Sequence, residues 1–404
     1  MPDDVAPVRR TVKHGVRAWF GQGPRRHGEP LLGRSVSYIE LFYDLVFVVL
    51  VSQSAHALAA HPGWGGAADF ATLFGLVWIA WINGTLYHEM HGREDGRSRF
   101  YIFAQMCVLA VLAVFMGDAA GADGTPFALT YVVLLVLLTW QWYEVRRRDL
   151  PEHKPASTPY ITGLLVTIAV MAASAWLAPA PRLLVWAVVV LGWVVLGTYG
   201  FVGRNRTLQF FQATDSLVER LALFVIIVLG ETVVGVVNGI NAAPDRDALT
   251  ITTGVIALCI GFGLWWNYFD VVGVRELRPQ STALATWFFG HLVQTGAIAA
   301  AGAAMVGLVS DARAPRTPPA VAWTLGLSVA LALVLVAIQA TTVERDPAEL
   351  STRLLAVVFG VGALLVLLLA WIAPAPWLLA LLVVGVLSLT WLMSFVPRTD
   401  DAAG

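Results

Sequence analysis

The chain has 404 residues, a formal net charge of −1 and 58% hydrophobic residues. Charged residues make up 13% of the chain, about half of the roughly 25% found in soluble proteins, and the mean hydropathy is +0.71. Such a chain cannot cover itself with polar surface, which excludes a soluble globular protein, a disordered protein and a nucleic-acid binder. We therefore expect an integral membrane protein whose solvent is the lipid bilayer.

Twelve apolar segments are long enough to cross a bilayer, which takes about 20 residues per helix. Helices satisfy their own backbone hydrogen bonds in lipid, so we predict an all-α protein with about twelve transmembrane helices. Short breaks that contain proline, such as residues 373–376, separate the last three segments. The twelve segments begin near Ser37, Ala67, Phe100, Pro126, Thr158, Pro181, Ser216, Leu249, Ser281, Pro319, Ser351 and Ala375.

Basic residues alternate between the two sides of these segments. If the N-terminus is cytoplasmic, 21 of the 26 Lys and Arg residues fall in cytoplasmic segments. Four fall on the opposite side, namely Arg182, Arg246, Arg313 and Arg316. Cytoplasmic loops carry this excess of positive charge, so the pattern predicts a plasma-membrane protein with both termini in the cytoplasm. The basic N-terminal tail is expected to bind anionic lipid headgroups.

Three helix pairs suggest an internal repeat. The segment from Ser37 aligns without gaps with the segment from Ser216, and Asn83 follows a Trp-rich run as Asn267 does. Six helices per half would make the repeats parallel, related by an axis along the membrane normal. The predicted organisation is a basic cytoplasmic tail at 1–36, a first six-helix repeat at 37–202, a linker at 203–214, a second repeat at 215–396 and a cytoplasmic tail at 397–404.

The first helix of each half also carries a family resemblance. The motif Glu40-Leu-Phe-Tyr-Asp44-Leu-Val-Phe-Val, followed by Gln53 and His56, resembles the opening signature of the LtrA family (bacterial low temperature requirement protein A). The segment from Glu219 to Glu231 and the Trp-Trp-Asn motif of the eighth segment resemble later signatures. The resemblance covers roughly residues 35 to 395. It implies a polytopic membrane protein without fixing an activity.

Ionisable side chains within membrane spans are costly and often functional, but some have structural explanations. Glu40 and Glu219 each follow a serine by three residues, the spacing of a helix-capping box, so we interpret both as structural. Arg220 would lie near the cytoplasmic interface, where it could reach toward the headgroups or form an ion pair with a carboxylate.

Asp44 and Glu231 are harder to explain structurally. Asp44 lies about 6 Å deeper than Glu40, too far for a cap, and Glu231 lies about 18 Å beyond Glu219 along its helix. We interpret Asp44 as a relay or cation site on the cytoplasmic side and Glu231 as a proton-titrating group. The alternative for Glu231 is a neutral acid that forms a structural hydrogen bond.

Neutral polar residues could complete such a site. Asn83, Gln105 and Asn267 would lie at a depth similar to that of Asp44 and could form a polar belt with it, although amides often only join helices. His291, close to mid-membrane, could relay protons because the pKa of histidine is easily shifted. It could equally be a neutral histidine of the core.

A metal site is not expected. The run His88-Glu89-Met90-His91 has suitable donors for zinc, but it lies where its helix should leave the membrane, so we interpret it as a solvated helix end. Cys107 and Cys259 lie within apolar segments and form no disulfide framework. No phosphate loop, nucleotide fingerprint or nucleophile elbow is present, so no cofactor is expected.

We favour a transporter or channel for a small ion or molecule that carries or is coupled to protons. The alternatives are an intramembrane enzyme acting on a lipid-linked or hydrophobic substrate and a membrane scaffold or sensor. An enzyme is the less favoured reading, because no catalytic motif is present. The sequence does not fix the transported species, the direction of transport or the oligomeric state.

Overall fold

The computed structural model describes residues 19, 21, 23–29, 36–202, 214–273, 275–346 and 349–395. Twelve helices in these ranges are long and apolar enough to cross a membrane, as predicted. No β-strand occurs among the same residues beyond an isolated bridge between Leu277 and Val343. Most of the predicted N-terminal tail, nearly all of the predicted linker and the predicted C-terminal tail lie outside the described residues.

The first six spans are α2 (Tyr38–Ala60), α3 (Trp64–His91), α4 (Gly96–Met116), α5 (Gly124–Arg148), α6 (Lys154–Ser174) and α7 (Pro179–Val202). The second six are α8 (Asp215–Ala242), α9 (Ala248–Tyr268), α10 (Ser281–Ser310), α11 (Pro319–Gln339), α12 (Thr352–Ile372) and α13 (Pro376–Ser394). A short π-helix, η1 (Phe269–Gly273), extends α9.

Several helices begin a few residues before the apolar segments from which the sequence predicted them. α4 begins at Gly96 rather than near Phe100, and α6 begins at Lys154 rather than near Thr158. The start of α4 is fixed by Asp95, whose side chain accepts a hydrogen bond of 2.8 Å from the Ser98 N–H. Hydropathy marks the part of a helix that lies in lipid, whereas polar capping groups mark where the helix begins.

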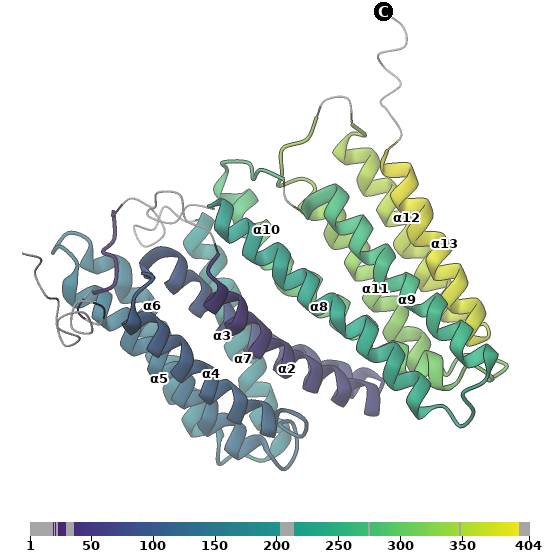
Figure 1. Ribbon diagram of the computed structural model, residues 1–404, viewed down its shortest axis with the longest axis horizontal. Coiled ribbons are helices and arrows are strands. Elements are labelled where there is room, and N and C mark those ends of the chain that lie inside the picture. The colour runs from purple at the N-terminus through teal and green to yellow at the C-terminus, as the bar shows by residue number, and fades with distance from the viewer. Residues whose placement is uncertain are drawn as a thin grey trace, which may run out of the picture.

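The two halves lie side by side, each as a group of six long helices (Figure 1). In each half, the first helix packs on the second and third, and the second packs on the fourth and sixth. The third to sixth helices of each half also pack on one another in sequence. The two halves thus share this pattern of helix contacts.

Two polar contacts also occupy equivalent positions in the two halves. Gln105 of α4 donates to Gln141 of α5 over 2.8 Å, and Gln339 of α11 lies 3.1 Å from His291 of α10. At the start of the fourth helix of each half, a threonine hydroxyl donates to a carbonyl of the loop between the fifth and sixth helices. These bonds are Thr125 to Ala175 (2.7 Å) and Thr317 to Pro374 (2.6 Å).

The halves meet mainly through α10, which contacts α2, α3 and α7, and through a contact between α2 and α8. Within the second half, α8 and α10 approach closely at glycines. A Cβ added to Gly235 would overlap the carbonyl oxygen of Gly302, and one added to Gly302 would lie 2.7 Å from the carbonyl oxygen of Glu231. Small residues permit this separation in membrane bundles.

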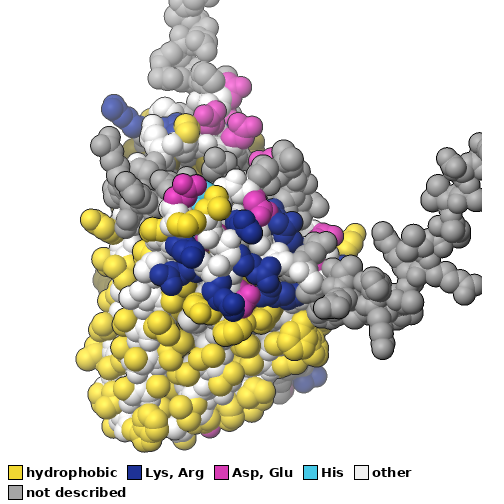
Figure 2. All heavy atoms as spheres, turned by 90° about the vertical axis from the view of Figure 1, so that its left-hand side faces the viewer, with side chains coloured by type: hydrophobic (Ala, Val, Ile, Leu, Met, Phe, Trp, Pro, Cys, Tyr) yellow, Lys and Arg dark blue, Asp and Glu magenta, His cyan; other side chains and the backbone are white. Residues whose placement is uncertain are grey.

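Basic side chains gather along one edge of the apolar surface (Figure 2). We call this side the arginine-rich face. The ends of α3 and α5 and the start of α4 meet there, and they carry Arg93, Arg97, Arg99, Arg146, Arg147 and Arg148. The helices α2 and α8 both begin on this side, because each half has an even number of spans.

Candidate functional site

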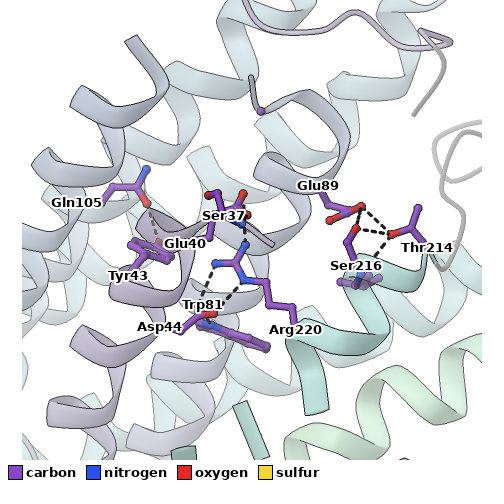
Figure 3. A network of polar contacts seen from close by, with 12 residues as sticks. Ser37, Glu40, Tyr43, Asp44, Trp81, Glu89, Gln105, Thr214, Ser216 and Arg220 are labelled. Atoms are coloured by element: carbon purple, nitrogen blue, oxygen red, sulfur yellow. Dashed lines mark hydrogen bonds and ion pairs between the residues drawn. The ribbon is translucent and has the colours of Figure 1, made fainter. Parts of the chain in front are cut away.

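A buried ion pair joins the first helices of the two halves. Arg220 of α8 donates to both carboxylate oxygens of Asp44 of α2, from Nη2 over 2.8 Å and from Nε over 3.1 Å (Figure 3). Asp44 is 0% exposed and Arg220 is 1% exposed. Both residues lie about 8–9 Å from the start of their helices on the arginine-rich face. An ion pair with a carboxylate was one of the two alternatives that the sequence left open for Arg220, and its partner is Asp44.

Aromatic side chains enclose this pair. The indole N–H of Trp81 donates to Asp44 over 2.8 Å, and its ring stacks on Phe224 of α8 at a centroid distance of 4.0 Å. The Arg220 guanidinium also lies over the Tyr43 ring at 6.0 Å. A carboxylate neutralised by arginine is not a vacant cation site, so the expectation that Asp44 itself binds a cation is not supported by its contacts.

Glu40 combines the predicted cap with a second role. Its carboxylate accepts a hydrogen bond of 3.1 Å from the Ser37 backbone N–H, and α2 begins with the predicted capping box. The same side chain lies 4.0 Å from Nη1 of Arg220, the one nitrogen of this guanidinium without a hydrogen-bond acceptor among the described residues. Glu40 therefore adds negative charge beside the buried pair.

The corresponding prediction for Glu219 was wrong. The N-cap of α8 is Thr214, whose hydroxyl accepts from the Leu217 N–H over 3.2 Å, so the helix begins before Ser216. Glu219 is exposed and takes no part in the cap. The Ser216 hydroxyl instead donates to Glu89 of α3 over 2.6 Å, and the Thr214 hydroxyl donates to the same carboxylate over 2.6 Å.

The interpretation of the segment 88–91 as a solvated helix end was also wrong. His88, Glu89 and His91 are each at most 2% exposed. Glu89 anchors the start of α8, and His91 lies beneath a segment near the N-terminus. Hydropathy could not reveal this burial, because the covering residues are distant in sequence and are themselves polar. No cluster of three or more His, Cys, Asp or Glu suited to a metal ion occurs within the described ranges.

The covering segment, residues 23–29, is here called the N-terminal clasp. The His27 backbone N–H and ring Nδ1 contact the two carboxylate oxygens of Asp149 at 3.0 and 2.8 Å. Arg25 donates to the Gly92 carbonyl, and Arg93 donates to Glu29 over 2.6 Å. Arg25 is thus bound to protein rather than to lipid. The other basic residues of the predicted lipid-binding tail, except Arg26, lie outside the described residues.

Asp149 lies just beyond the end of α5, outside the membrane spans. Burial by itself would raise the pKa of the Asp149 carboxyl. The hydrogen bonds from the His27 ring and backbone outweigh this effect, so the pKa of Asp149 lies below its ordinary value of 3.8. The carboxylate is therefore charged when the clasp is closed.

Two further contacts join α2 and α8 deeper in the bundle. Glu231 is 3% exposed, and its carboxyl interacts with the Ser52 side chain of α2. Closer to the face opposite the arginine-rich one, Asn238 Nδ2 donates to His56 Nε2 over 2.7 Å. Ser52, His56 and Asn238 are partly exposed, whereas Asp44 and Arg220 are not.

The expected polar belt does not form as a single group. The partner of Gln105 on α2 is Tyr43 rather than Asp44: the Tyr43 hydroxyl donates to the Gln105 side chain over 2.7 Å. Asn83 is buried and donates to the Ile79 carbonyl of its own helix, over 2.8 Å. Asn267 is bonded to α13, to the Leu387 carbonyl and the Thr390 hydroxyl, each over 3.0 Å. Gln105 and Asn267 thus join neighbouring helices within their halves, the alternative left open by the sequence, whereas the hydrogen bond of Asn83 stays within α3.

His291 is fully buried, and both of its ring nitrogens have partners. The Tyr268 hydroxyl lies 2.7 Å from Nε2, and the Trp287 carbonyl lies 2.7 Å from Nδ1. A neutral imidazole with hydrogen on Nδ1 satisfies both bonds. The geometry thus fits the neutral core histidine. One turn away, Gln294 is 0% exposed, and neither of its amide atoms has a partner among the described residues.

A comparison with known families identifies the chain. The family model described as "Bacterial low temperature requirement A protein (LtrA)" matches residues 35–386, most of the chain. The protein belongs to the LtrA family. The match spans both halves, from before Glu40 to within α13, and does not include the N-terminal clasp at residues 23–29.

The chain is also similar to a Rhizobium meliloti (strain 1021) protein whose description is "uncharacterized". It is 27% identical over 282 residues, which are 65% of this chain and 66% of the relative. The alignment thus covers just under two thirds of the relative's length.

Several residues that build the site were not singled out from the sequence. Trp81 and Ser52 have no unusual spacing, and each is one of many similar residues in apolar helices. Glu89 was noticed, but its partners Thr214 and Ser216 lie across a turn whose position hydropathy does not define. Their roles depend on how α2, α3 and α8 pack together, which no local pattern specifies.

Proposed function

We propose that this LtrA protein is a proton-coupled carrier whose path follows the contact between α2 and α8. The single observation that carries the proposal is the buried acid Glu231 on α8, facing Ser52 of the other half. No described Lys, Arg or His forms an ion pair with Glu231, in contrast to Asp44. An intramembrane acid without a fixed counter-charge is suited to gain and lose a proton during transport.

The arrangement favours a carrier over an open channel. The polar contacts of α2 and α8 lie at two ends, Asp44–Arg220 near the arginine-rich face and Ser52–Glu231 followed by His56–Asn238 beyond mid-membrane. The stacked rings of Trp81 and Phe224 lie beside the first pair. In the proposed cycle, the ion pair and these rings close the arginine-rich side, and their separation exposes Glu231 to it. Alternating access of this kind involves motion of one half against the other.

The test is proton flux into liposomes that contain the purified protein, under an imposed membrane potential. Wild type is compared with Glu231→Gln and, as a matched control, with Glu219→Gln, an exposed acid on the same helix. We expect flux in wild type and Glu219→Gln and its loss in Glu231→Gln. Folded wild-type protein without flux, or an unchanged Glu231→Gln variant, would overturn the proposal. Thermal unfolding confirms that each variant is folded.

We further propose that the arginine-rich face is cytoplasmic in the plasma membrane, as the excess of positive charge favours. A chain with Cys107→Ser and Cys259→Ser can carry one new cysteine at Glu152, on the arginine-rich face, or at Asp245, on the opposite face. Both sites are exposed. In intact cells, a membrane-impermeant maleimide is expected to label the cysteine at 245 and not the one at 152. The reverse pattern would contradict the orientation.

The rival function, an intramembrane enzyme, needs free acids and histidines at one depth near the interface. The groups near the arginine-rich face are engaged with the chain itself. Glu89 accepts from Thr214 and Ser216, and Asp149 accepts from His27. These contacts are typical of structural anchors, so the geometry favours transport over catalysis.

A further inference from the structure

Apart from the contact between α2 and α8, the two halves do not contact each other through equivalent helices in the described part of the chain. α10, the third helix of the second half, packs against α2, α3 and α7 of the first half. Its counterpart α4 makes no comparable contact with α8, α9 or α13 in the described part of the chain. In the first half, α4 therefore occupies the position that α10 has in the second half, but within the described ranges it does not pack against the other half of its own chain.

The contacts of α10 show which side chains this packing uses. The Phe289 ring lies 6.2 Å from Trp78 of α3, and a Cβ added to Gly197 of α7 would overlap the same ring. Further along α10, a Cβ added to Gly296 would lie 3.2 Å from the ring of Phe74, a residue of α3. An apolar cavity of about 310 Å³ remains between α3, α7, α10 and α11.

The register of the repeat identifies the counterparts on α4. His291 and Gln105 correspond, because each follows an aromatic run and each pairs with a glutamine of the next helix. Phe289 then corresponds to Phe103, which is 60% exposed. Val293 and Gly296, which line the cavity, correspond to Cys107 and Ala110. Phe103, Cys107 and Ala110 form one exposed stripe, here called the α4 ridge.

The second half presents the matching surface. With Asn83 aligned to Asn267, Phe74, Gly75 and Trp78 correspond to Leu258, Cys259 and Phe262 of α9. All three are exposed, Phe262 by 52%.

The motif Ala-Pro-Ala-Pro occurs at 178–181 and at 373–376, and it aligns α7 with α13. Gly197 then corresponds to Leu392, which is 57% exposed. Val190, which lines the cavity, corresponds to Gly385, where an added Cβ would meet nothing. We call the set Leu258, Cys259, Phe262, Gly385 and Leu392 the α9–α13 face.

We propose that the α4 ridge of one chain packs on the α9–α13 face of a second copy, and the reverse, in a closed two-fold dimer. Each chain supplies one unused ridge and one unused face, and a two-fold axis satisfies both at once. Four six-helix halves would then form a ring that repeats the contact already present within the chain. This inference rests on the repeat and not on the proposed transport activity.

The two native cysteines report on this contact. Their counterparts Gly75 and Val293 line the same cavity, so Cys107 of one copy is expected close to Cys259 of the other. In native membranes, a short bis-maleimide should link two chains in wild type. The link should be lost in both Cys107→Ser and Cys259→Ser. It should return when these two variants, carrying different tags, are expressed together.

Other outcomes of this cross-linking would overturn the proposal. Linking that survives in either single-cysteine variant would show a contact between identical helices. The absence of linking in wild type, with both thiols reactive toward a monofunctional maleimide, would show that lipid covers these surfaces.

A second test measures the mass of the purified protein in mild detergent by light scattering. Wild type should have the mass of two chains, and Ala110→Trp on the α4 ridge should have the mass of one. Val188→Trp provides the control, because Val188 is 60% exposed on α7, outside the ridge and the face. A monomeric wild type, or an Ala110→Trp variant that stays dimeric, would contradict the proposed surface.

Discussion

Gly235 of α8 and Gly302 of α10 lie so close that a Cβ on Gly235 would overlap the carbonyl oxygen of Gly302. Gly235→Ala should therefore force the helices apart and cost about 1–3 kcal/mol, the usual effect of overpacking. Gly230→Ala on the same helix is the control, because its added Cβ meets nothing within 4 Å. It should be neutral or gain up to about 1 kcal/mol of helix propensity. Thermal unfolding in detergent compares the two, and equal losses would refute this packing.

The pair formed by Asp44 and Arg220 predicts a strongly non-additive pair of substitutions. Arg220→Met leaves the Asp44 charge buried without a cation, and Asp44→Leu leaves Arg220 with only Glu40, at 4.0 Å, so each should cost about 3–5 kcal/mol. The double variant removes both charges and should lose less stability than either single variant. Unfolding followed by tryptophan fluorescence measures all three. Single losses that simply add in the double variant would show that the two side chains are not coupled.

The start of α8 predicts an unequal effect of two neighbouring hydroxyls. Thr214 caps the helix and donates to Glu89, whereas Ser216 only donates to Glu89. Thr214→Ala should therefore be about 1 kcal/mol more destabilising than Ser216→Ala, the usual contribution of an N-cap. The comparison uses urea or thermal unfolding under identical conditions. A larger effect for Ser216→Ala would place the cap elsewhere.

The N-terminal clasp should depend on pH through Asp149. Because the pKa of this carboxyl is depressed below 3.8 in the folded protein, its stabilisation is present above that value. It is lost as the pH falls through the folded pKa. Hydrogen exchange of residues 23–29, corrected for intrinsic rates, should show protection at about pH 5 that weakens progressively as the pH is lowered below 3.8.

Asp149→Asn should expose the same residues already at the higher pH. Glu152→Gln, an exposed acid three residues further along the chain, should leave the protection unchanged. Equal protection of wild type and Asp149→Asn at about pH 5 would show that the clasp is held by other contacts, such as the hydrogen bond between Arg93 and Glu29.

The sequence predicted the number of spans and the family, because lipid imposes a minimum length of apolar helix that single segments reveal. It also predicted the capping role of Glu40 and offered an ion pair with a carboxylate as one of two alternatives for Arg220. It did not predict which acid pairs with Arg220, since Glu40 and Asp44 lie one turn apart on the same face of their helix. That choice depends on how α8 is rotated against α2.

The error at His88 and His91 has a different cause. The arginines that follow them suggested water, but one of them, Arg93, holds the clasp over the histidines through hydrogen bonds to Gly23 and Glu29. Charge near a helix end thus marks the membrane boundary, but it does not distinguish a solvated end from one covered by protein. The tertiary contacts of residues 23–29 could not be inferred from their own composition.

The distance along the chain between Asp44 and Arg220 has a consequence for synthesis of the protein. The two residues are separated by 176 positions. At roughly 5–20 residues per second, the ribosome needs about 10 to 35 s to pass from one codon to the other. During this time α2 has entered the membrane with an acid that still lacks its arginine. The nascent first half must therefore hold that carboxyl protonated, or shielded at the insertion machinery, until α8 arrives.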